Sequence, residues 1–83
     1  MKYIIYAKED CPFCDKLLEF MKKNNKRFIY LVLYNLEDEL NEIKERYDWE
    51  TIPMVVELEG DNDQGKFIGG CEDTIEYLKR GDS

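Results

Sequence analysis

The sequence predicts an α/β domain in which a four-stranded mixed β-sheet is flanked by three helices, in the order β-α-β-α-β-β-α. Three observations support this fold class. Short runs of β-branched and aromatic residues alternate with amphipathic segments of helical period, and residues that favour turns separate them. The length of 83 residues suits one compact domain, so residues 1–83 are predicted to form a single domain.

The first half of the chain is expected to form a βαβ unit. Residues 3–6 indicate a buried strand, and after a polar loop Pro12 suits the first position of a helix, where its missing N–H would be unpaired anyway. Apolar residues at helical spacing follow, and Asn24-Asn25 ends this helix. Residues 28–34 are apolar throughout, which is typical of a strand covered on both faces. This strand is expected to lie parallel to the first.

The second half begins with a predicted helix. Asn35 is expected to be its N-cap, with acidic residues in the first turn and apolar residues at helical spacing as far as Tyr47. The remaining predicted elements are a strand over 54–58, a hairpin turn over 60–65, its return strand over 66–68 and, after Gly69-Gly70, a last helix. The helices are expected on both faces of the sheet.

The charge of the chain excludes some partners. With 19 acidic against 12 basic residues, the net charge is −7, which argues against binding to nucleic acid. Eleven of the acids lie between residues 37 and 63, which predicts one acidic, solvated flank.

No apolar run is long enough to span a membrane, and the start lacks the pattern of a signal peptide. We therefore expect a cytoplasmic protein that binds no membrane. We also expect it to be a monomer.

The chain has three cysteines and no histidine. An odd, sparse count does not form a disulfide scaffold, and without histidine no Ser-His or Cys-His nucleophile pair can exist. Zinc sites need four ligands, and the cysteines supply at most three thiolates. A three-thiolate site completed by a carboxylate or by a second chain stays open, but we predict no metal site and no tightly bound cofactor.

The segment Cys11-Pro12-Phe13-Cys14 stands at the junction of the first predicted strand and helix. The thiolate is the attacking species in disulfide exchange, and unpaired N–H groups at a helix N-terminus stabilise it. We therefore expect Cys11 to be the exposed attacking nucleophile and Cys14 the partly covered, protonated resolving thiol. Lys8 adds positive charge near the thiolate, and the neighbouring acidic residues oppose it. This placement favours a redox dithiol over a metal site.

Three separated segments resemble the motifs of one family. Cys11-Pro12-Phe13-Cys14, Thr51-Ile52-Pro53 and Gly69-Gly70-Cys71-Glu72-Asp73 are similar to the C-P-[YF]-C, T-[VI]-P and G-G-x-x-D motifs of glutaredoxins. The resemblance spans nearly the whole chain and implies the thioredoxin fold. The short length is similar to that of compact bacterial or phage-encoded members.

The resemblance also implies a binding site for glutathione or a disulfide substrate. Pro53 would be cis and face the dithiol, and the main chain of Ile52 would pair with the substrate cysteine. Asp73 would hold the ammonium group of glutathione, or cap the last helix, or both. Lys8 would meet the glycyl carboxylate, or be a solvated loop lysine. The residues implied in binding are Lys8, Phe13, Thr51, Ile52, Pro53, Gly70, Cys71, Glu72 and Asp73.

The chain departs from the family pattern at two places. Where the family often has Arg or Gln before T-V-P, this chain has Trp49-Glu50, and Arg46 is the nearest substitute. Met54 follows the proline in place of the common Gln. We therefore expect weaker binding of glutathione and a protein disulfide as the main client, with Phe13 and Trp49 as an apolar rim, unless Trp49 only caps the core. The thiol of Cys71 is expected to pack inward.

The resemblance implies a dithiol oxidoreductase that reduces protein disulfides and glutathione mixed disulfides. Glutathione is the expected co-substrate, with glutathione or a thioredoxin-reductase-like enzyme as the reductant and ribonucleotide reductase among the clients. One alternative is a carrier in which Cys11 and glutathione bridge an iron–sulfur cluster between two chains, against which Pro12 argues because such members usually lack it. The other is an interaction module of the same fold with an inert dithiol.

Overall fold

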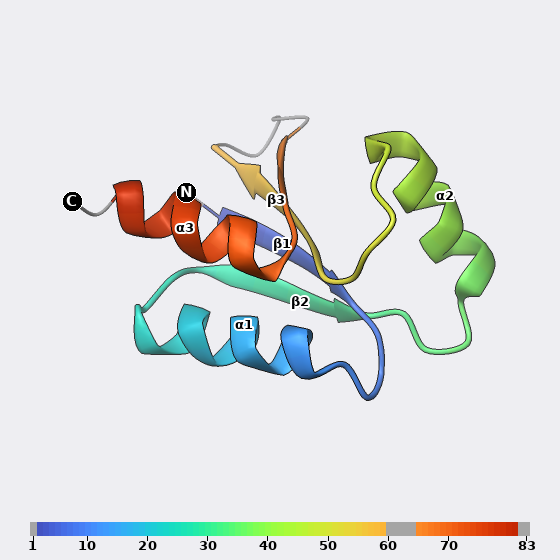
Figure 1. Cartoon of the computed structure of the whole chain (residues 1–83), viewed down its shortest axis with the longest axis horizontal. Helices are drawn as coiled ribbons and strands as arrows, with labels where there is room; N and C mark the ends of the chain where they lie inside the picture. The colour runs from blue at the N-terminus through green and yellow to red at the C-terminus, as the bar shows by residue number, and fades with distance from the viewer. Residues whose placement is uncertain (1, 60–64, 82–83) are drawn as a thin grey trace.

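The computed structural model describes residues 2–59 and 65–81 of the chain (Figure 1). Within them the predicted order of strands and helices is confirmed. The elements are β1 (Lys2–Ala7), α1 (Pro12–Lys23), β2 (Phe28–Val32), α2 (Glu37–Tyr47), β3 (Met54–Leu58), β4 (Lys66–Gly69) and α3 (Cys71–Gly81). Most of the hairpin turn predicted over residues 60–65 lies outside the described residues.

The four strands form one mixed sheet in the order β2-β1-β3-β4. β1 and β2 are parallel, whereas β3 runs antiparallel to both β1 and β4. In this register Tyr6, near the end of β1, is paired with Met54 at the start of β3. The sheet therefore brings the segment that follows β1, which contains both Cys11 and Cys14, to the same end as Pro53.

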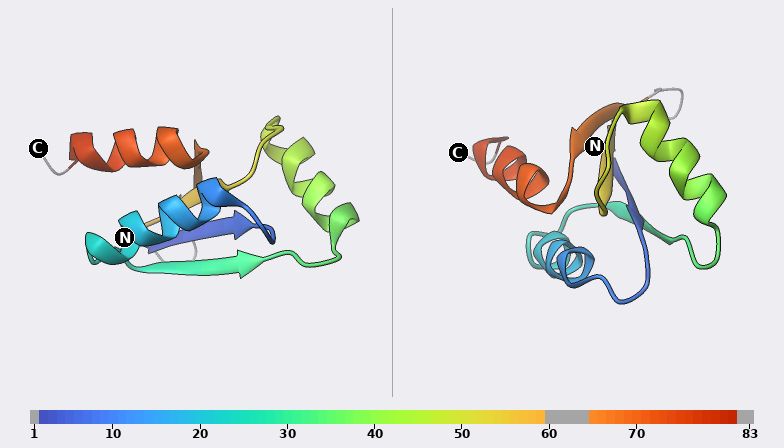
Figure 2. Two further views of the ribbon diagram at one scale, coloured as in Figure 1. Left: turned by 60° about the horizontal axis from the view of Figure 1, so that its bottom comes forward. Right: turned by 45° about the vertical axis from the view of Figure 1, so that its right-hand side comes forward.

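Two of the helices share one face of the sheet. α1 and α3 lie side by side there, and α2 lies on the other side (Figure 2). The prediction of helices on both faces is therefore confirmed. α2 stands toward the end of the strands at which the dithiol segment emerges (Figures 1 and 2).

The prediction that the strand over 28–34 is covered on both faces is wrong. β2 is an edge strand, and Ile29 and Leu31 are 42% and 41% exposed. Phe28 and Tyr30 point the other way and pack against the core under α1. The apolar run identified the strand, but its second face is left open because α2 does not extend over Ile29 and Leu31.

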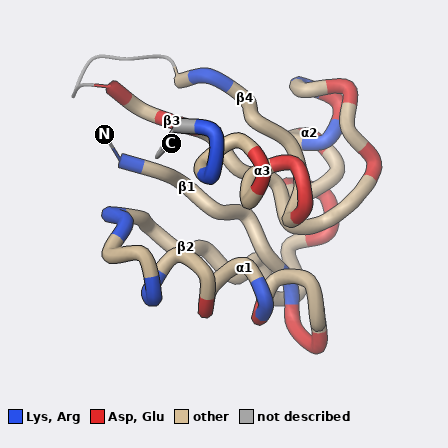
Figure 3. Tube along the Cα trace, turned by 60° about the vertical axis from the view of Figure 1, so that its left-hand side comes forward, with Lys and Arg blue, Asp and Glu red and all other residues tan. Residues whose placement is uncertain are grey.

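The expected N-cap of α2 is also wrong. The helix begins after Leu36, which makes no side-chain cap hydrogen bond. Asn35 has a φ of 56°, the left-handed region that Asn tolerates, whereas an N-cap residue needs extended backbone. The predicted acidic flank is confirmed only in part: the seven acidic residues from Glu37 to Glu50 are exposed along α2 and the loop after it (Figure 3), whereas Glu57 is buried in β3 and Asp61 and Asp63 lie outside the described residues.

The far end of α2 is tied to β4 by aromatic rings. Tyr47 stacks on Phe67 with ring centroids 4.7 Å apart, and Trp49 meets the same ring edge-on at 5.3 Å. Such pairs contribute about 0.5–1.5 kcal/mol beyond the apolar area that they bury. These contacts fix the position of the chain just before Thr51.

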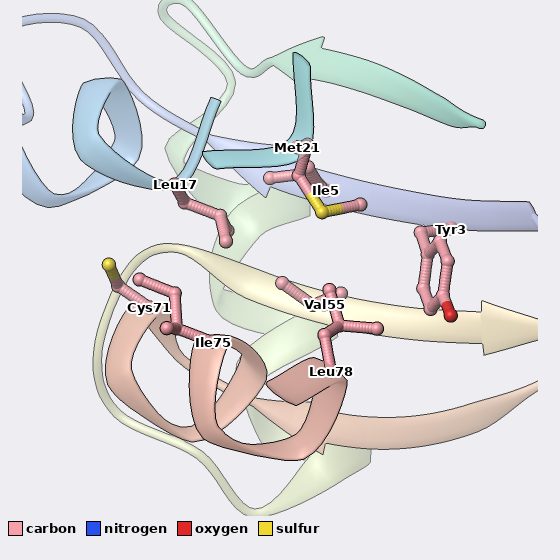
Figure 4. Close-up of a cluster of buried hydrophobic side chains, with 8 residues drawn as sticks. All are labelled: Tyr3, Ile5, Leu17, Met21, Val55, Cys71, Ile75 and Leu78. Atoms are coloured by element: carbon pink, nitrogen blue, oxygen red, sulfur yellow. The ribbon is translucent and has the colours of Figure 1, made fainter. Parts of the chain in front are cut away.

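The hydrophobic core lies between the sheet and the pair of helices α1 and α3 (Figure 4). Burying a Leu, Ile or Met side chain of this kind stabilises a fold by about 1.5–3 kcal/mol. The buried cluster consists of Tyr3, Ile5, Leu17, Met21, Val55, Cys71, Ile75 and Leu78. The expected inward face of the last helix, with Cys71, Ile75 and Leu78, is thereby confirmed.

Candidate active site

Cys11 is the N-cap residue of α1. Its backbone is extended, with a φ of −114°, and its Sγ atom accepts a hydrogen bond from the main-chain N–H of Cys14 at 3.3 Å. Pro12 occupies the first turn, as predicted, where the missing N–H leaves no donor unpaired. The sulfur of Cys11 thus lies at the positive end of the helix dipole, where a thiolate is stabilised.

The two cysteines are more buried than predicted. Cys11 is only 6% exposed and Cys14 is fully buried, so the expectation of an exposed Cys11 and a partly covered Cys14 is wrong, although Cys11 is the more accessible of the two. The reason is the loop before β3: the thiol of Cys11 donates to the carbonyl oxygen of Ile52 at 3.9 Å. Ile52 and Tyr30 pack against the buried cluster formed by Ala7, Cys11 and Cys14. A disulfide can therefore reach Cys11 only through the small part of its surface that is exposed.

The thiol of Cys14 is held protonated at neutral pH. Its pKa is raised to about 12, chiefly by burial, and also by the hydrogen bond with Cys11 and the negative charges of Cys11 and Asp15. A main-chain hydrogen bond from Lys8 acts in the opposite direction and lowers the pKa. A protonated, covered thiol is the state expected of the residue that acts second in disulfide exchange.

The segment Thr51-Ile52-Pro53 lies beside the dithiol. The Ile52–Pro53 peptide bond is cis, as the resemblance implies, and Pro53 is buried while Thr51 is exposed. A Cβ atom on Gly70 would lie 3.5 Å from the carbonyl oxygen of Pro53 and 3.9 Å from Oγ1 of Thr51. The loop before β3 and the start of α3 are therefore in close contact, with glycine at the point of approach.

Asp73 caps the start of α3. Its Oδ2 accepts a hydrogen bond from the main-chain N–H of Gly70 at 3.4 Å, and the N–H of Thr74 donates to the Gly70 carbonyl at 3.0 Å. An acidic side chain that reaches back to the N-cap residue is half of a capping box. The helix-cap interpretation of Asp73 is therefore confirmed, and its role in binding a ligand stays a prediction.

The two residues between Gly70 and Asp73 differ in environment. Cys71 is 5% exposed, and burial, followed by the charge of Glu72, raises the pKa of its thiol. Glu72 points outward and forms an ion pair with Lys16 of α1, with Nζ and Oε1 2.6 Å apart. The Glu72 carboxylate thus links α3 to the helix that carries the dithiol.

Lys8 lines a hollow of about 460 Å³ beside the loop that precedes the dithiol. Lys44 of α2 lines the same hollow, whereas Arg46, the expected substitute cation, is not among its lining residues. Acidic side chains border it too: Glu9, Asp10 and Glu37. Sequence reasoning missed Lys44 because only the fold brings α2 next to this loop.

The side chains proposed as an apolar rim do not behave alike. Phe13 is 58% exposed next to Cys11, as a contact surface requires. Trp49 is half-buried against Phe67, which fits its alternative role of covering the core. Met54 is fully buried, so its side chain cannot touch a ligand in place of the family's Gln.

Tyr30 is a site residue that sequence reasoning missed. It packs against the cluster of Ala7, Cys11 and Cys14 from β2, on the strand face that also carries Phe28. The only signal in the sequence is its place in the alternation of the 28–34 run.

Within residues 2–59 and 65–81, no group of three or more His, Cys, Asp or Glu is arranged to hold a metal ion, and no helix is long and apolar enough to cross a membrane.

Comparison with known proteins identifies the fold and the family. The sequence model of glutaredoxins matches residues 3–60. The solution structure of a glutaredoxin from Brucella melitensis is 23% identical, with a TM-score of 0.73 over 98% of this chain and 82% of that chain. The dithiolic glutaredoxin 2-C-Grx1 from Trypanosoma brucei brucei is 24% identical, with a TM-score of 0.73 over 95% of this chain and 78% of that chain.

The crystal structure of the thioredoxin-like protein BC3987 is also similar. It is 26% identical, with a TM-score of 0.67 over 94% of this chain and 96% of that chain. A search of the curated proteins finds no match. The family match and the dithiol at a helix N-terminus support a thiol–disulfide oxidoreductase role, and the chain belongs to the glutaredoxin family.

Proposed function

We propose that the protein reduces disulfides by a two-cysteine mechanism. The observation that carries the proposal is the hydrogen bond of 3.3 Å from the Cys14 N–H to the Cys11 sulfur at the start of α1. The Cys11 thiolate attacks one sulfur of the substrate disulfide, forms a mixed disulfide and expels the other sulfur as a thiolate, which takes up a proton. Cys14 then loses its proton and attacks Cys11, which releases the second substrate thiol and leaves the Cys11–Cys14 disulfide.

The substrate lies along the loop before β3. The carbonyl oxygen of Ile52 already accepts a hydrogen bond from the Cys11 thiol. A substrate sulfur bonded to Cys11 would therefore lie next to the main chain of Ile52. That main chain offers a carbonyl and an N–H for antiparallel pairing with the substrate cysteine. Thr51 and Gly70 border the same approach.

Glutathione is the proposed co-substrate. Lys8 and Lys44 line one hollow next to the dithiol loop and supply two positive charges for the glycyl carboxylate. The start of α3, with Gly70, Cys71, Glu72 and Asp73, supplies main-chain N–H groups and carboxylates for the γ-glutamyl end. Since Glu72 is engaged by Lys16, Asp73 is the carboxylate proposed to take the ammonium group.

A protein disulfide is the proposed main client. Phe13 offers an exposed aromatic ring beside Cys11, while neither Met54 nor Trp49 adds a polar contact for glutathione. By family resemblance, ribonucleotide reductase is one such client, with glutathione or a thioredoxin-reductase-like enzyme as the reductant. We assign the reaction to the cytoplasm, where small thiols keep cysteines reduced.

Turnover with two substrates tests the proposal. A protein disulfide and a glutathione mixed disulfide are each supplied with glutathione and glutathione reductase, and in parallel with thioredoxin reductase. Cys11→Ser is expected to lose both activities, and Cys14→Ser only the reduction of the protein disulfide. Turnover that survives in Cys11→Ser, or full protein-disulfide reduction by Cys14→Ser, would contradict the mechanism.

A further inference from the structure

Tyr30 lies beneath the dithiol but belongs to β2, which is distant from Cys11 and Cys14 in the sequence. It is paired with Ile5 in the parallel register of β1 and β2, so its side chain rises from the sheet toward α1. There it packs against the cluster formed by Ala7, Cys11 and Cys14. Tyr30 is half-buried, whereas Tyr34, after the end of the same strand, is 59% exposed.

The second step of the proposed reaction has a chemical difficulty at Cys14. Its thiol is fully buried and must still become a thiolate in order to attack Cys11. Two of the causes that raise its pKa, the hydrogen bond with the Cys11 sulfur and the charge on that sulfur, are removed once Cys11 is bound in a mixed disulfide. Burial, the largest cause, persists. The forming thiolate therefore needs hydrogen-bond donors inside the protein.

Among the residues that the structure describes, two hydrogen-bond donors lie close to Cys14. One is the main-chain N–H of Lys8, which lowers the pKa of Cys14. The other is the phenol of Tyr30. Its ring packs against the cluster that contains Cys14. The pKa of this phenol is raised to about 12, chiefly by burial, then by the charges of Cys14, Asp15 and Cys11, and last by a hydrogen bond with the side chain of Cys14. Tyr30 thus keeps its proton at neutral pH and remains a donor. The chain has no histidine that could serve instead.

We propose that the hydroxyl group of Tyr30 donates a hydrogen bond to the Cys14 sulfur as it becomes a thiolate, and so speeds the step in which Cys14 resolves the mixed disulfide. In that step the Cys14–Cys11 bond forms and the bond between Cys11 and the substrate sulfur breaks. The departing thiolate takes up a proton, and Tyr30 keeps its own. This inference rests on the two-cysteine mechanism proposed above.

The experiment follows both steps in one reaction. Reduced protein is mixed rapidly with dithiobis(nitrobenzoate), a symmetric disulfide that releases one coloured thiolate when Cys11 attacks and a second when Cys14 resolves. Mildly acidic buffer leaves less of Cys14 ionised, which slows the second release enough to follow it. Cys71→Ala is the common background, so that the third thiol takes no part. Tyr30→Phe retains the ring that packs in the core, and Tyr34→Phe is the matched control.

The expected result is a defect confined to the second release. Tyr30→Phe should slow that phase by about tenfold or more, the factor expected from one hydrogen bond to an ionised group. The first release should stay within about twofold, and Tyr34→Phe should change neither phase. The slowed phase should also need a higher pH to reach half its maximal rate. The groups that face Cys14 and contribute to this profile are Cys11, Asp15, Tyr30 and the main chain of Lys8.

The outcomes separate this inference from the mechanism on which it rests. A second release within about twofold of the parent rate, or equal slowing of both releases, would overturn the role of Tyr30. Absence of any rapid release from the parent protein would instead overturn the proposed function. In a Cys14→Ser background only the first release remains, and Tyr30→Phe should leave its rate unchanged.

Discussion

The main-chain N–H of Cys14 donates a hydrogen bond across 3.3 Å to the sulfur of Cys11. This contact makes the first cysteine both the cap of α1 and the atom toward which the helix directs its positive end. Cys14, one helical turn after Cys11, is fully buried. The difference between the two thiols is therefore built by the start of one helix and the loop that packs on it.

The burial of Cys14 predicts a pH dependence of stability in the reduced protein. Its folded pKa of about 12 lies above the ordinary value of 9.0. Its contribution to the free energy of unfolding is then fully present below pH 9 and is lost as the pH rises toward 12. Between these values, reduced wild type should lose stability more steeply than Cys14→Ser, as measured by urea unfolding at a series of pH values. Parallel slopes would contradict the burial of this thiol.

The two neighbouring glycines before α3 predict effects of different size when one methyl group is added. Gly69 has a φ of 136°, and a Cβ atom there would lie 2.9 Å from the side chain of Asp73. Gly69→Ala should therefore lower the free energy of unfolding by about 1–3 kcal/mol. At Gly70 the nearest atoms are at ordinary contact distances, so Gly70→Ala should change stability by less than about 1 kcal/mol.

The same pair of variants separates binding from folding. The added methyl at Gly70 would stand beside Pro53 and Thr51, where the substrate is proposed to lie. Gly70→Ala should thus reduce kcat/KM for a glutathione mixed disulfide although the fold is retained. If turnover is unchanged in Gly70→Ala, the substrate does not pass this glycine.

The shared hollow of Lys8 and Lys44 predicts equivalent roles for the two cations. If both meet the glycyl carboxylate, Lys8→Ala and Lys44→Ala should each raise KM for a glutathione mixed disulfide by about twofold to fivefold, the size of a solvent-screened charge contact. The effect should shrink in high salt. Lys23→Ala, at the far end of α1, is the control and should leave KM unchanged. An effect of Lys8→Ala alone would remove Lys44 from the site.

A buried carboxylate predicts a stability defect far from the dithiol. Glu57 is 4% exposed, and its Oε1 accepts a hydrogen bond from the hydroxyl of Tyr77 at 2.9 Å. Tyr77→Phe removes this donor but keeps the ring under the ammonium group of Lys66, so unfolding should become easier by about 1.5–3 kcal/mol. Tyr34→Phe, at an exposed ring, should cost less than about 0.5 kcal/mol. Equal values for the two variants would show that Glu57 does not depend on Tyr77.

The order of the elements was predictable because each carries its own local pattern. The periodic apolar residues of α1, with Leu17 and Met21, and the alternating residues of β1 specify helix and strand before any packing is known. The dithiol was predictable for the same reason, since Pro12 marks the start of the helix that stabilises Cys11.

The errors arose where distant segments decide the outcome. The burial of Cys11 depends on Ile52, 41 residues away in the sequence. The exposure of Leu31 depends on the position of α2 relative to the sheet. Neither position is encoded in the local pattern of the cysteine or of the strand. The contact of Tyr30 with Cys14 likewise depends on the register of β2 against β1.

The most direct test of the two-cysteine mechanism is to trap its intermediate. Reduced Cys14→Ser and Cys11→Ser variants, both in the Cys71→Ala background, are incubated with glutathione disulfide, and the intact proteins are weighed by mass spectrometry. The account predicts one glutathione on Cys11 in the Cys14→Ser variant and none, over the same time, in the Cys11→Ser variant, where the buried Cys14 is the only thiol. An adduct that forms equally fast on Cys14 would contradict the assignment of Cys11 as the attacking residue.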